Sequence, residues 1–236
     1  MGSFASALSY RIPRNKDWIS KRSSCSACGK ALTAIDLIPL LSWAVNKGQC
    51  RQCGSKVSVF YPLQEICSAL LCLGIYAAFG MTVQALIIIF TIPFLIALFL
   101  IDLEHKRLPD ILVIIVASFG LIRLAYIGAS NGLDISIYLI EYGAGAVVFS
   151  FIFWLMGMLT GKILNKQALG LGDVKFAAAS GLWLGLSNLS YFLILSGVLG
   201  VAIGLVWKYI VKEAKFPFGP ALILSLYILL LTQGTS

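Results

Sequence analysis

Charged residues are scarce in this chain: they make up 12% of its 236 residues, whereas apolar residues make up 59%. An ordinary soluble domain is about half apolar and about one quarter charged. The composition therefore argues against a soluble domain and favours a membrane protein. The sequence has a single histidine, and its 10 acidic residues are outnumbered by 18 Lys and Arg. Such a basic excess either binds nucleic acid or marks cytoplasmic loops, and the positions of the charges decide between the two.

A cleavable signal peptide is also lacking, because residues 1–12 have neither a charged n-region nor an adequate apolar stretch. Residues 11–60 form a polar, turn-rich and basic segment, and nearly everything after it is apolar with short polar breaks. We therefore expect two parts. Residues 1–60 should hold an N-terminal segment with a small cytoplasmic module, and residues 61–236 a helical membrane domain.

The apolar stretches predict an all-α polytopic membrane protein with about seven transmembrane helices. A span needs about 20 apolar residues. The fifth candidate is short and rich in Ala, Gly and Ser, which is typical of a helix packed among other helices. The candidates cover residues 64–80, 82–101, 111–128, 135–160, 174–187, 189–210 and 219–233.

The basic residues predict the orientation of these helices. With the polar module inside, the inner loops lie at residues 11–60, 102–110, 161–173 and 211–218, and every Lys and Arg except Arg123 lies in or near one of them. This is the positive-inside pattern. It explains the basic excess without nucleic acid as a partner. It also places Asp102, at the end of the second span, and Asp173, at the start of the fifth span, at the same membrane face.

Two cysteine pairs form the strongest local motif: Cys25-Ser-Ala-Cys28 and Cys50-Arg-Gln-Cys53. Each pair can place two thiolates on one metal ion, so together they predict a tetrahedral structural zinc site. The alternative is two disulfides, which are rare in the reducing cytoplasm. A glycine after each pair suits a tight turn. The remaining two, Cys67 and Cys72, lie in the first span, and we interpret them as small buried apolar residues.

Acidic residues at membrane depth are costly, so each suggests function and needs an alternative explanation. Asp102 closes the apolar run FLIALFLI, and its alternative is a plain carboxylate at a helix end. Asp173 ends Gly170-Leu-Gly-Asp173 and could cap the next helix. Asp110 precedes ILVIIV, and here we favour the cap. His105 lies in a charged loop, where a solvated role is more common than catalysis.

Asp102 and Asp173 are more informative as a pair. Peptide hydrolysis by two carboxylates needs one ionised group, which activates water, and one protonated group, which polarises the scissile carbonyl. We expect the two to face each other across a cleft open to the cytoplasm. We also predict an ion pair between Arg123 and Glu141, which should lie at similar depth in the third and fourth spans.

The sequence resembles the type IV prepilin peptidases, also called leader peptidase/N-methyltransferases, almost from end to end. The motifs that carry the resemblance follow one another in order. They are Gly2-Ser-Phe4 with Tyr10-Arg-Ile-Pro13, the two Cys pairs, Asp36-Leu-Ile-Pro-Leu-Leu-Ser42, Tyr61-Pro-Leu-Gln-Glu65, Ile101-Asp102 with Leu108-Pro-Asp110, Gly170-Leu-Gly-Asp173-Val-Lys175, and Pro217-Phe-Gly-Pro220.

The resemblance implies that Asp102 and Asp173 are the catalytic aspartates of a GxGD-type protease in the bacterial inner membrane. Such enzymes cut the short basic leader from prepilins or type II secretion pseudopilins at the cytoplasmic face, and many then methylate the new N-terminus using S-adenosylmethionine. Family members usually have an apolar span before Gly-Ser-Phe and an Asn after it. Here the motif begins at residue 2 and continues with Ala5 and Ser6, so the resemblance implies a missing or upstream first helix and makes proteolysis a firmer expectation than methylation.

Two other functions remain as alternatives. An ion-coupled transporter also uses carboxylates within the membrane, although it would need them distributed through membrane depth. A zinc-bearing scaffold for pilus assembly would carry the cysteine module without catalysis. Replacement of Asp102 or Asp173 by Asn separates these readings, since only the protease loses a cleavage activity.

Overall fold

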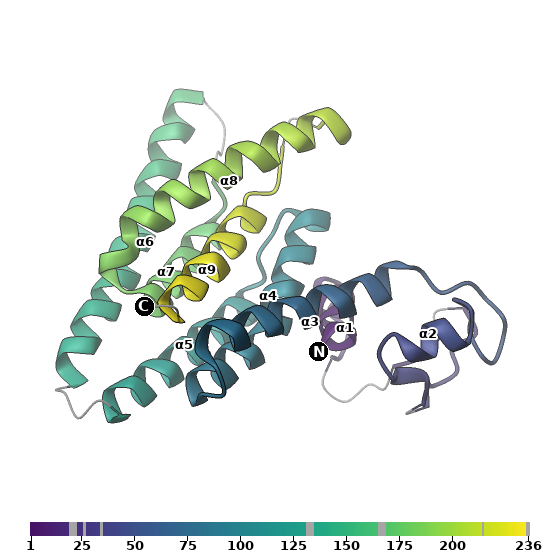
Figure 1. Cartoon of the computed structure of the whole chain (residues 1–236). Helices are drawn as coiled ribbons and strands as arrows, with labels where there is room; N and C mark the ends of the chain where they lie inside the picture. Colours follow the sequence, from purple (N-terminus) through teal and green to yellow (C-terminus); the bar gives the residue numbers. More distant parts are fainter. Residues whose placement is uncertain are drawn as a thin grey trace.

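The computed structural model describes residues 1–18, 23–25, 27–33, 35–130, 135–164, 169–213 and 215–234. Over these residues the fold is helical, and its β structure is limited to two isolated bridges. Figure 1 shows a bundle of long helices with the small cysteine module at one end. The α-helices are α1 (Gly2–Arg11), α2 (Leu41–Val45), α3 (Phe60–Phe79), α4 (Val83–His105), α5 (Asp110–Ser130), α6 (Ile135–Leu164), α7 (Leu171–Leu184), α8 (Leu189–Ile210) and α9 (Gly219–Gly234).

Helices α3 to α9 correspond in order to the seven predicted spans. Among the described residues, five helices are long and apolar enough to cross a membrane: α3, α4, α5, most of α6, and α8 with the turn before it. Helix α9 is a shorter apolar helix of 16 residues, and α7 has 14. At 1.5 Å per residue α7 is only about 21 Å long, less than the hydrocarbon core of about 30 Å. The protein is thus a polytopic membrane protein, and a count of seven spans stays a prediction.

Helix α7 lies inside the bundle, where it contacts α5, α6 and α9 (Figure 1). Its contact with α6 depends on two glycines: a Cβ built on Gly181 would lie 2.4 Å from the carbonyl carbon of Gly145. Backbones that approach this closely leave no room for a side chain. The composition of the fifth candidate span, rich in small residues, therefore correctly predicts a tightly packed helix.

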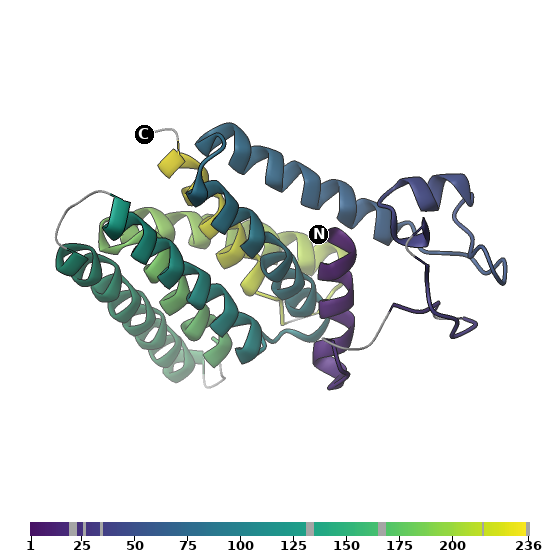
Figure 2. The ribbon, with the colours of Figure 1, turned by 90° about the horizontal axis from the view of Figure 1, so that it is seen from below.

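The N-terminal helix α1 packs on the start of α3 and the side of α4 (Figure 2). The hydroxyl groups of Ser3 and Ser6 donate to the side chains of Glu65 and Gln64 on α3. The second carboxylate oxygen of Glu65 accepts the backbone N–H of Leu40 at 2.8 Å, just before α2. Glu65 therefore connects the bundle, α1 and the cysteine module.

The predicted ion pair between Arg123 and Glu141 is wrong. Arg123 is buried, and its guanidinium donates to the carbonyl oxygen of Trp183 at 2.9 Å and to Gln233 Oε1 at 3.0 Å. Glu141 instead accepts the backbone N–H and the hydroxyl of Ser187, at 2.8 and 2.6 Å. The prediction considered only opposite charges, whereas both side chains bond to neutral carbonyl, amide and hydroxyl groups, and the buried Arg123 Nε has no hydrogen-bond partner among the described residues.

Four of the predicted polar segments are described only in part. The inner segments at residues 11–60 and 211–218 include residues 19–22, 26, 34 and 214, which lie outside the described residues. The outer break at residues 130–134 and the inner loop at residues 161–173 include residues 131–134 and 165–168, which lie outside the described part of the chain.

Candidate active site and metal centre

The four cysteines of the N-terminal module converge on one point. The Sγ atoms of Cys25, Cys28, Cys50 and Cys53 all lie within 4.8 Å of one another, and those of Cys25 and Cys53 are 3.9 Å apart. All four are free thiols. Zinc–sulfur bonds of about 2.3 Å in a tetrahedron place the sulfurs about 3.8 Å apart. The predicted clustering is confirmed, and the donor set fits a structural zinc ion.

Each cysteine pair is held by the same local turn. Cys25 N donates to the Lys30 carbonyl oxygen at 2.9 Å and Gly29 N to that of Cys25 at 2.9 Å. The same two bonds recur one pair later, from Cys50 N to Ser55 and from Gly54 N to Cys50, both at 2.8 Å. Both glycines have positive φ values, 70° and 68°, which a glycine adopts without strain. The module thus contains two copies of one metal-binding turn.

The backbone of this turn also favours a metal-binding thiolate. The N–H groups of Cys28 and Ala27 point at the Cys25 sulfur and lower the pKa of that thiol to about 6. A thiolate is the form that binds metal.

The other two cysteines, Cys67 and Cys72, lie on α3, as predicted, but Cys67 is exposed on the helix surface rather than buried.

Asp102 lies in the last turn of α4 and is 4% exposed. Its Oδ2 atom accepts the backbone N–H of Gly219 at 2.9 Å, at the start of α9. A Cβ built on Gly219 would lie 2.7 Å from that same oxygen. Only glycine lets this N–H reach the carboxylate, so the residue between Phe218 and Pro220 fixes the position of Asp102.

Asp173 lies in the first turn of α7 and is partly buried. Its Oδ2 atom accepts the Gly170 N–H at 3.2 Å. The alternative role as the cap of a helix beginning at residue 174 is wrong in position, because α7 begins at Leu171 and its N-cap is Gly170. The Asp173 carboxylate also interacts electrostatically with that of Asp102. A capping bond to one oxygen leaves the rest of the carboxylate free for other chemistry.

Leu108 brings the two aspartates to the same end of the bundle. A Cβ built on Gly172, the residue before Asp173, would lie 3.1 to 3.3 Å from the backbone N, O and Cβ of Leu108. The Cδ2 atom of Leu108 lies 3.1 Å from a Cβ built on Gly219, the partner of Asp102. Leu108 is 5% exposed. It is therefore wedged between the glycine next to Asp173 and the glycine that holds Asp102.

Asp110 begins α5, close to its predicted place, but its carboxylate does not cap that helix. Both of its oxygens accept from Lys175 Nζ, at 2.8 Å each, and Lys175 lies on α7 just after Asp173. The first backbone bonds of α5 go to the Pro109 carbonyl oxygen instead. The cap prediction was wrong because a cation from another helix outcompetes a local N–H group for the carboxylate.

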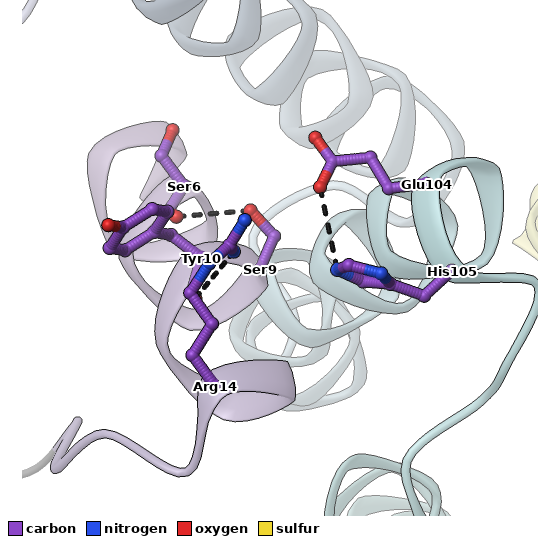
Figure 3. Close-up of polar contacts among 6 residues, drawn as sticks. All are labelled: Ser6, Ser9, Tyr10, Arg14, Glu104 and His105. Atoms are coloured by element: carbon purple, nitrogen blue, oxygen red, sulfur yellow. Dashed lines mark hydrogen bonds and ion pairs between the residues drawn. The ribbon is translucent and has the colours of Figure 1, made fainter.

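His105 lies at the end of α4 beside Glu104, with its Nε2 atom 3.7 Å from the carboxylate (Figure 3). Both side chains are substantially exposed. Figure 3 also shows the C-terminal half of α1 and the turn after it opposite this end of α4. In α1, Ser9 donates to the Ser6 carbonyl oxygen, and Arg14, in the turn, donates to the Tyr10 carbonyl oxygen. In this setting His105 has the solvated role expected of it.

A groove of about 840 Å³ follows α8 towards the aspartates. Its walls are mostly apolar, and its lining includes Val201, Leu205 and Phe216. It reaches Phe218, the residue before the glycine that bonds Asp102. Neither aspartate lines the groove, and Phe218 is the lining residue next to the Gly219–Asp102 bond.

Comparison with known proteins decides the family. Residues 1–79 match the bacterial peptidase A24 N-terminal domain, and residues 89–205 match the type IV leader peptidase family. The chain belongs to the type IV leader peptidase family. No solved structure shows significant similarity to it.

Curated relatives of this leader peptidase cover most of its length. A prepilin leader peptidase/N-methyltransferase of Legionella pneumophila is 35% identical over 86% of this chain and 70% of the relative. A protein of the same name from Aeromonas hydrophila is 36% identical over 89% of this chain and 71% of its own. A type 4 prepilin-like proteins leader peptide-processing enzyme of Escherichia coli O78:H11 is 34% identical over 94% of this chain and 77% of the relative.

Two residues of this leader peptidase gain importance only in the structure: Gly219 and Leu108. Both belong to motifs that the sequence displays, Pro217-Phe-Gly-Pro220 and Leu108-Pro-Asp110. Neither motif indicates its partner, since Gly219 and Asp102 are separated by 117 positions. A glycine between an aromatic residue and a proline was the available signal, because it indicates a backbone site that tolerates no side chain.

Proposed function

We propose that this leader peptidase is an aspartic endopeptidase in which Asp102 and Asp173 cut the short basic leader from type IV prepilins or type II secretion pseudopilins. The observation that carries the proposal is the contact of Leu108 with both Gly172 and Gly219. This contact supports a catalytic pair because it joins the residue next to Asp173 to the hydrogen-bond partner of Asp102.

In the proposed mechanism the two carboxylates share one proton, because two such groups held close together cannot both ionise. The ionised carboxylate removes a proton from water, and the oxygen of that water attacks the scissile carbonyl carbon. The protonated carboxylate gives its proton to the carbonyl oxygen. When the C–N bond breaks, the leaving amine takes up the proton that water lost. One hydroxyl of the tetrahedral intermediate returns its proton to the second carboxylate as the carbonyl group re-forms, so the pair returns to its starting state. The apolar groove along α8 offers room for the substrate segment beside Asp102.

We further propose that the cysteine cluster binds zinc and that the module and the aspartates face the cytoplasm from the inner membrane. The spacing of the sulfurs supports zinc, and the distribution of Lys and Arg supports the orientation. The names of the relatives support a second activity, N-methylation of the new N-terminus with S-adenosylmethionine. We place the boundary between the N-terminal segment and the protease domain at residue 60, where α3 begins.

The alternatives have less support. A transporter would need ionisable groups spread through membrane depth, whereas Arg123 and Glu141 both make hydrogen bonds to neutral groups near one end of the bundle. A scaffold without catalysis gives no reason for a glycine packed under a buried carboxylate.

The proposal is tested by co-expressing a prepilin with the wild type, Asp102→Asn or Asp173→Asn and measuring the fraction cleaved. We expect either variant to reduce cleavage at least about 100-fold, the low end of what general acid–base catalysis contributes. Amounts in the membrane and zinc content should match the wild type. Normal processing by Asp102→Asn would reject the proteolytic mechanism.

A further inference from the structure

Residues Lys106 to Asp110 join α4 to α5 and include the first residue of α5. We call this segment the link, and both of its ends contact the rest of the bundle. Its first residue ends α4 in a left-handed conformation, with φ 53°. The ammonium group of Lys106 pairs with Glu213, after α8, and lies 5.7 Å from the centre of the Trp207 ring. Its last residue, Asp110, accepts two bonds from Lys175 on α7. The link therefore connects α7 and α8 to its own two helices.

The middle of the link, Leu108, lies against the glycines next to the two aspartates. The backbone of Leu108 lies against Gly172, and its side chain lies against Gly219. These two glycines come from opposite sides of the site, one beside Asp173 and one bonded to Asp102. A buried Leu packed on two residues without side chains leaves little freedom to shift, because protein interiors are close-packed.

We propose that Leu108 is a positioning residue that sets the separation of the two catalytic carboxylates, and that the Asp110–Lys175 ion pair holds it in place. This inference rests on the proposed function of Asp102 and Asp173. Leu108 itself touches neither the water nor the peptide in this account. Its effect passes through Gly172 and Gly219, which means that it should change the chemical step rather than the binding of the substrate.

The ion pair contributes little to stability on its own, since both side chains are about half exposed. Its importance is geometric. Lys175 lies on the same helix as Asp173, and Asp110 follows Leu108 and Pro109 directly. The pair therefore joins the start of α5 to the beginning of α7, the helix that carries Asp173.

The first test compares Leu108→Ala with Leu124→Ala, a change of the same kind at a buried position of α5 near its other end. Both variants are purified as full-length membrane protein and assayed for prepilin cleavage. We expect Leu108→Ala to lower kcat at least about 10-fold with KM within about twofold, the signature of a loss confined to the transition state. Leu124→Ala should keep the wild-type kcat. Equal kcat values for the two variants would overturn the proposal.

The second test uses the ion pair and does not depend on the folding of a cavity variant. Asp110→Asn, Lys175→Gln and the double variant should all lower kcat by the same factor, because removing either partner removes the whole interaction. Lys175→Arg, which keeps the pair, should restore kcat. A double variant clearly worse than Asp110→Asn alone would mean that Lys175 acts directly on the substrate or on Asp173, and would overturn the role assigned to the pair.

The wild type and Asp173→Asn are assayed in the same series. If the wild type cleaves and Asp173→Asn does not, the proposed function stands whatever the Leu108 variants do. If Asp173→Asn cleaves normally, the proposed function fails first, and the positioning role fails with it.

Discussion

The cysteine module and the aspartate site are built in opposite ways. Each metal-binding turn is closed by hydrogen bonds between residues only a few positions apart, and the same turn is used twice. At the aspartate site the Gly170–Asp173 bond is local, but the bond between Gly219 and Asp102 spans 117 positions. The first kind of site depends mainly on its own turn, whereas the second depends on the packing of the whole bundle. The two should therefore respond differently to the same kind of change.

The largest expected difference comes from Gly219→Ala. The added Cβ would lie 2.7 Å from Asp102 Oδ2, so the carboxylate or the start of α9 has to move. A displacement of about 1 Å at a catalytic group costs about 100-fold in rate, and we expect a loss of this order in kcat/KM. Zinc content should not change.

The matched control for this variant is Gly143→Ala on α6, where an added Cβ meets nothing within 4 Å. It should cleave at the wild-type rate. Full activity of Gly219→Ala would show that Asp102 does not need this close contact.

Cys50→Ser tests the opposite case, in which the cysteine module is changed and the aspartate site is left intact. Loss of one thiolate should abolish stoichiometric zinc binding by the purified protein, as measured by metal analysis. The aspartates are held by residues of α4, α5, α7 and α9, so we expect cleavage in detergent to stay within about threefold of the wild type. A loss as large as that of Gly219→Ala would mean that the two sites are coupled, with Glu65 as the connection to examine.

A smaller effect is expected from Arg123→Ala, far from both sites. Its removal takes the guanidinium bond away from the buried Trp183 carbonyl, which costs about 1 to 3 kcal/mol in unfolding free energy. Thermal unfolding in detergent checks this, with Ile122→Ala, an exposed neighbour on α5, as the control. Equal stability of the two variants would contradict a structural role for the buried guanidinium.

The smallest effect is expected from Ser187→Ala, which removes one of the two donors to Glu141. The backbone N–H remains and the site is exposed, so the loss should be below about 1 kcal/mol. A larger shift in thermal unfolding would mean that Glu141 has a greater part in the fold than its two bonds indicate.

The same contrast explains how much the sequence could predict. The order of the helices, the cysteine cluster and the presence of Asp102 and Asp173 at one end follow from local patterns: apolar length, Cys spacing and the positions of Lys and Arg. The partners of Arg123, Glu141 and Asp110 do not. Each of these side chains is satisfied by a group on another helix, and nothing in the spacing of charges shows which polar group the packing will bring closest.

The central claim is that Asp102 and Asp173 meet at one end of the bundle, and crosslinking measures this most directly. Asp102→Cys and Asp173→Cys are combined with Cys67→Ala and Cys72→Ala, and a short bifunctional thiol reagent is added to the protein in membranes. Mass spectrometry should identify a crosslinked peptide pair joining positions 102 and 173. A control protein with Asp102→Cys and Ser187→Cys, at opposite ends of the bundle, should give none. Absence of the 102–173 crosslink, or a yield no higher than the control, would contradict the account.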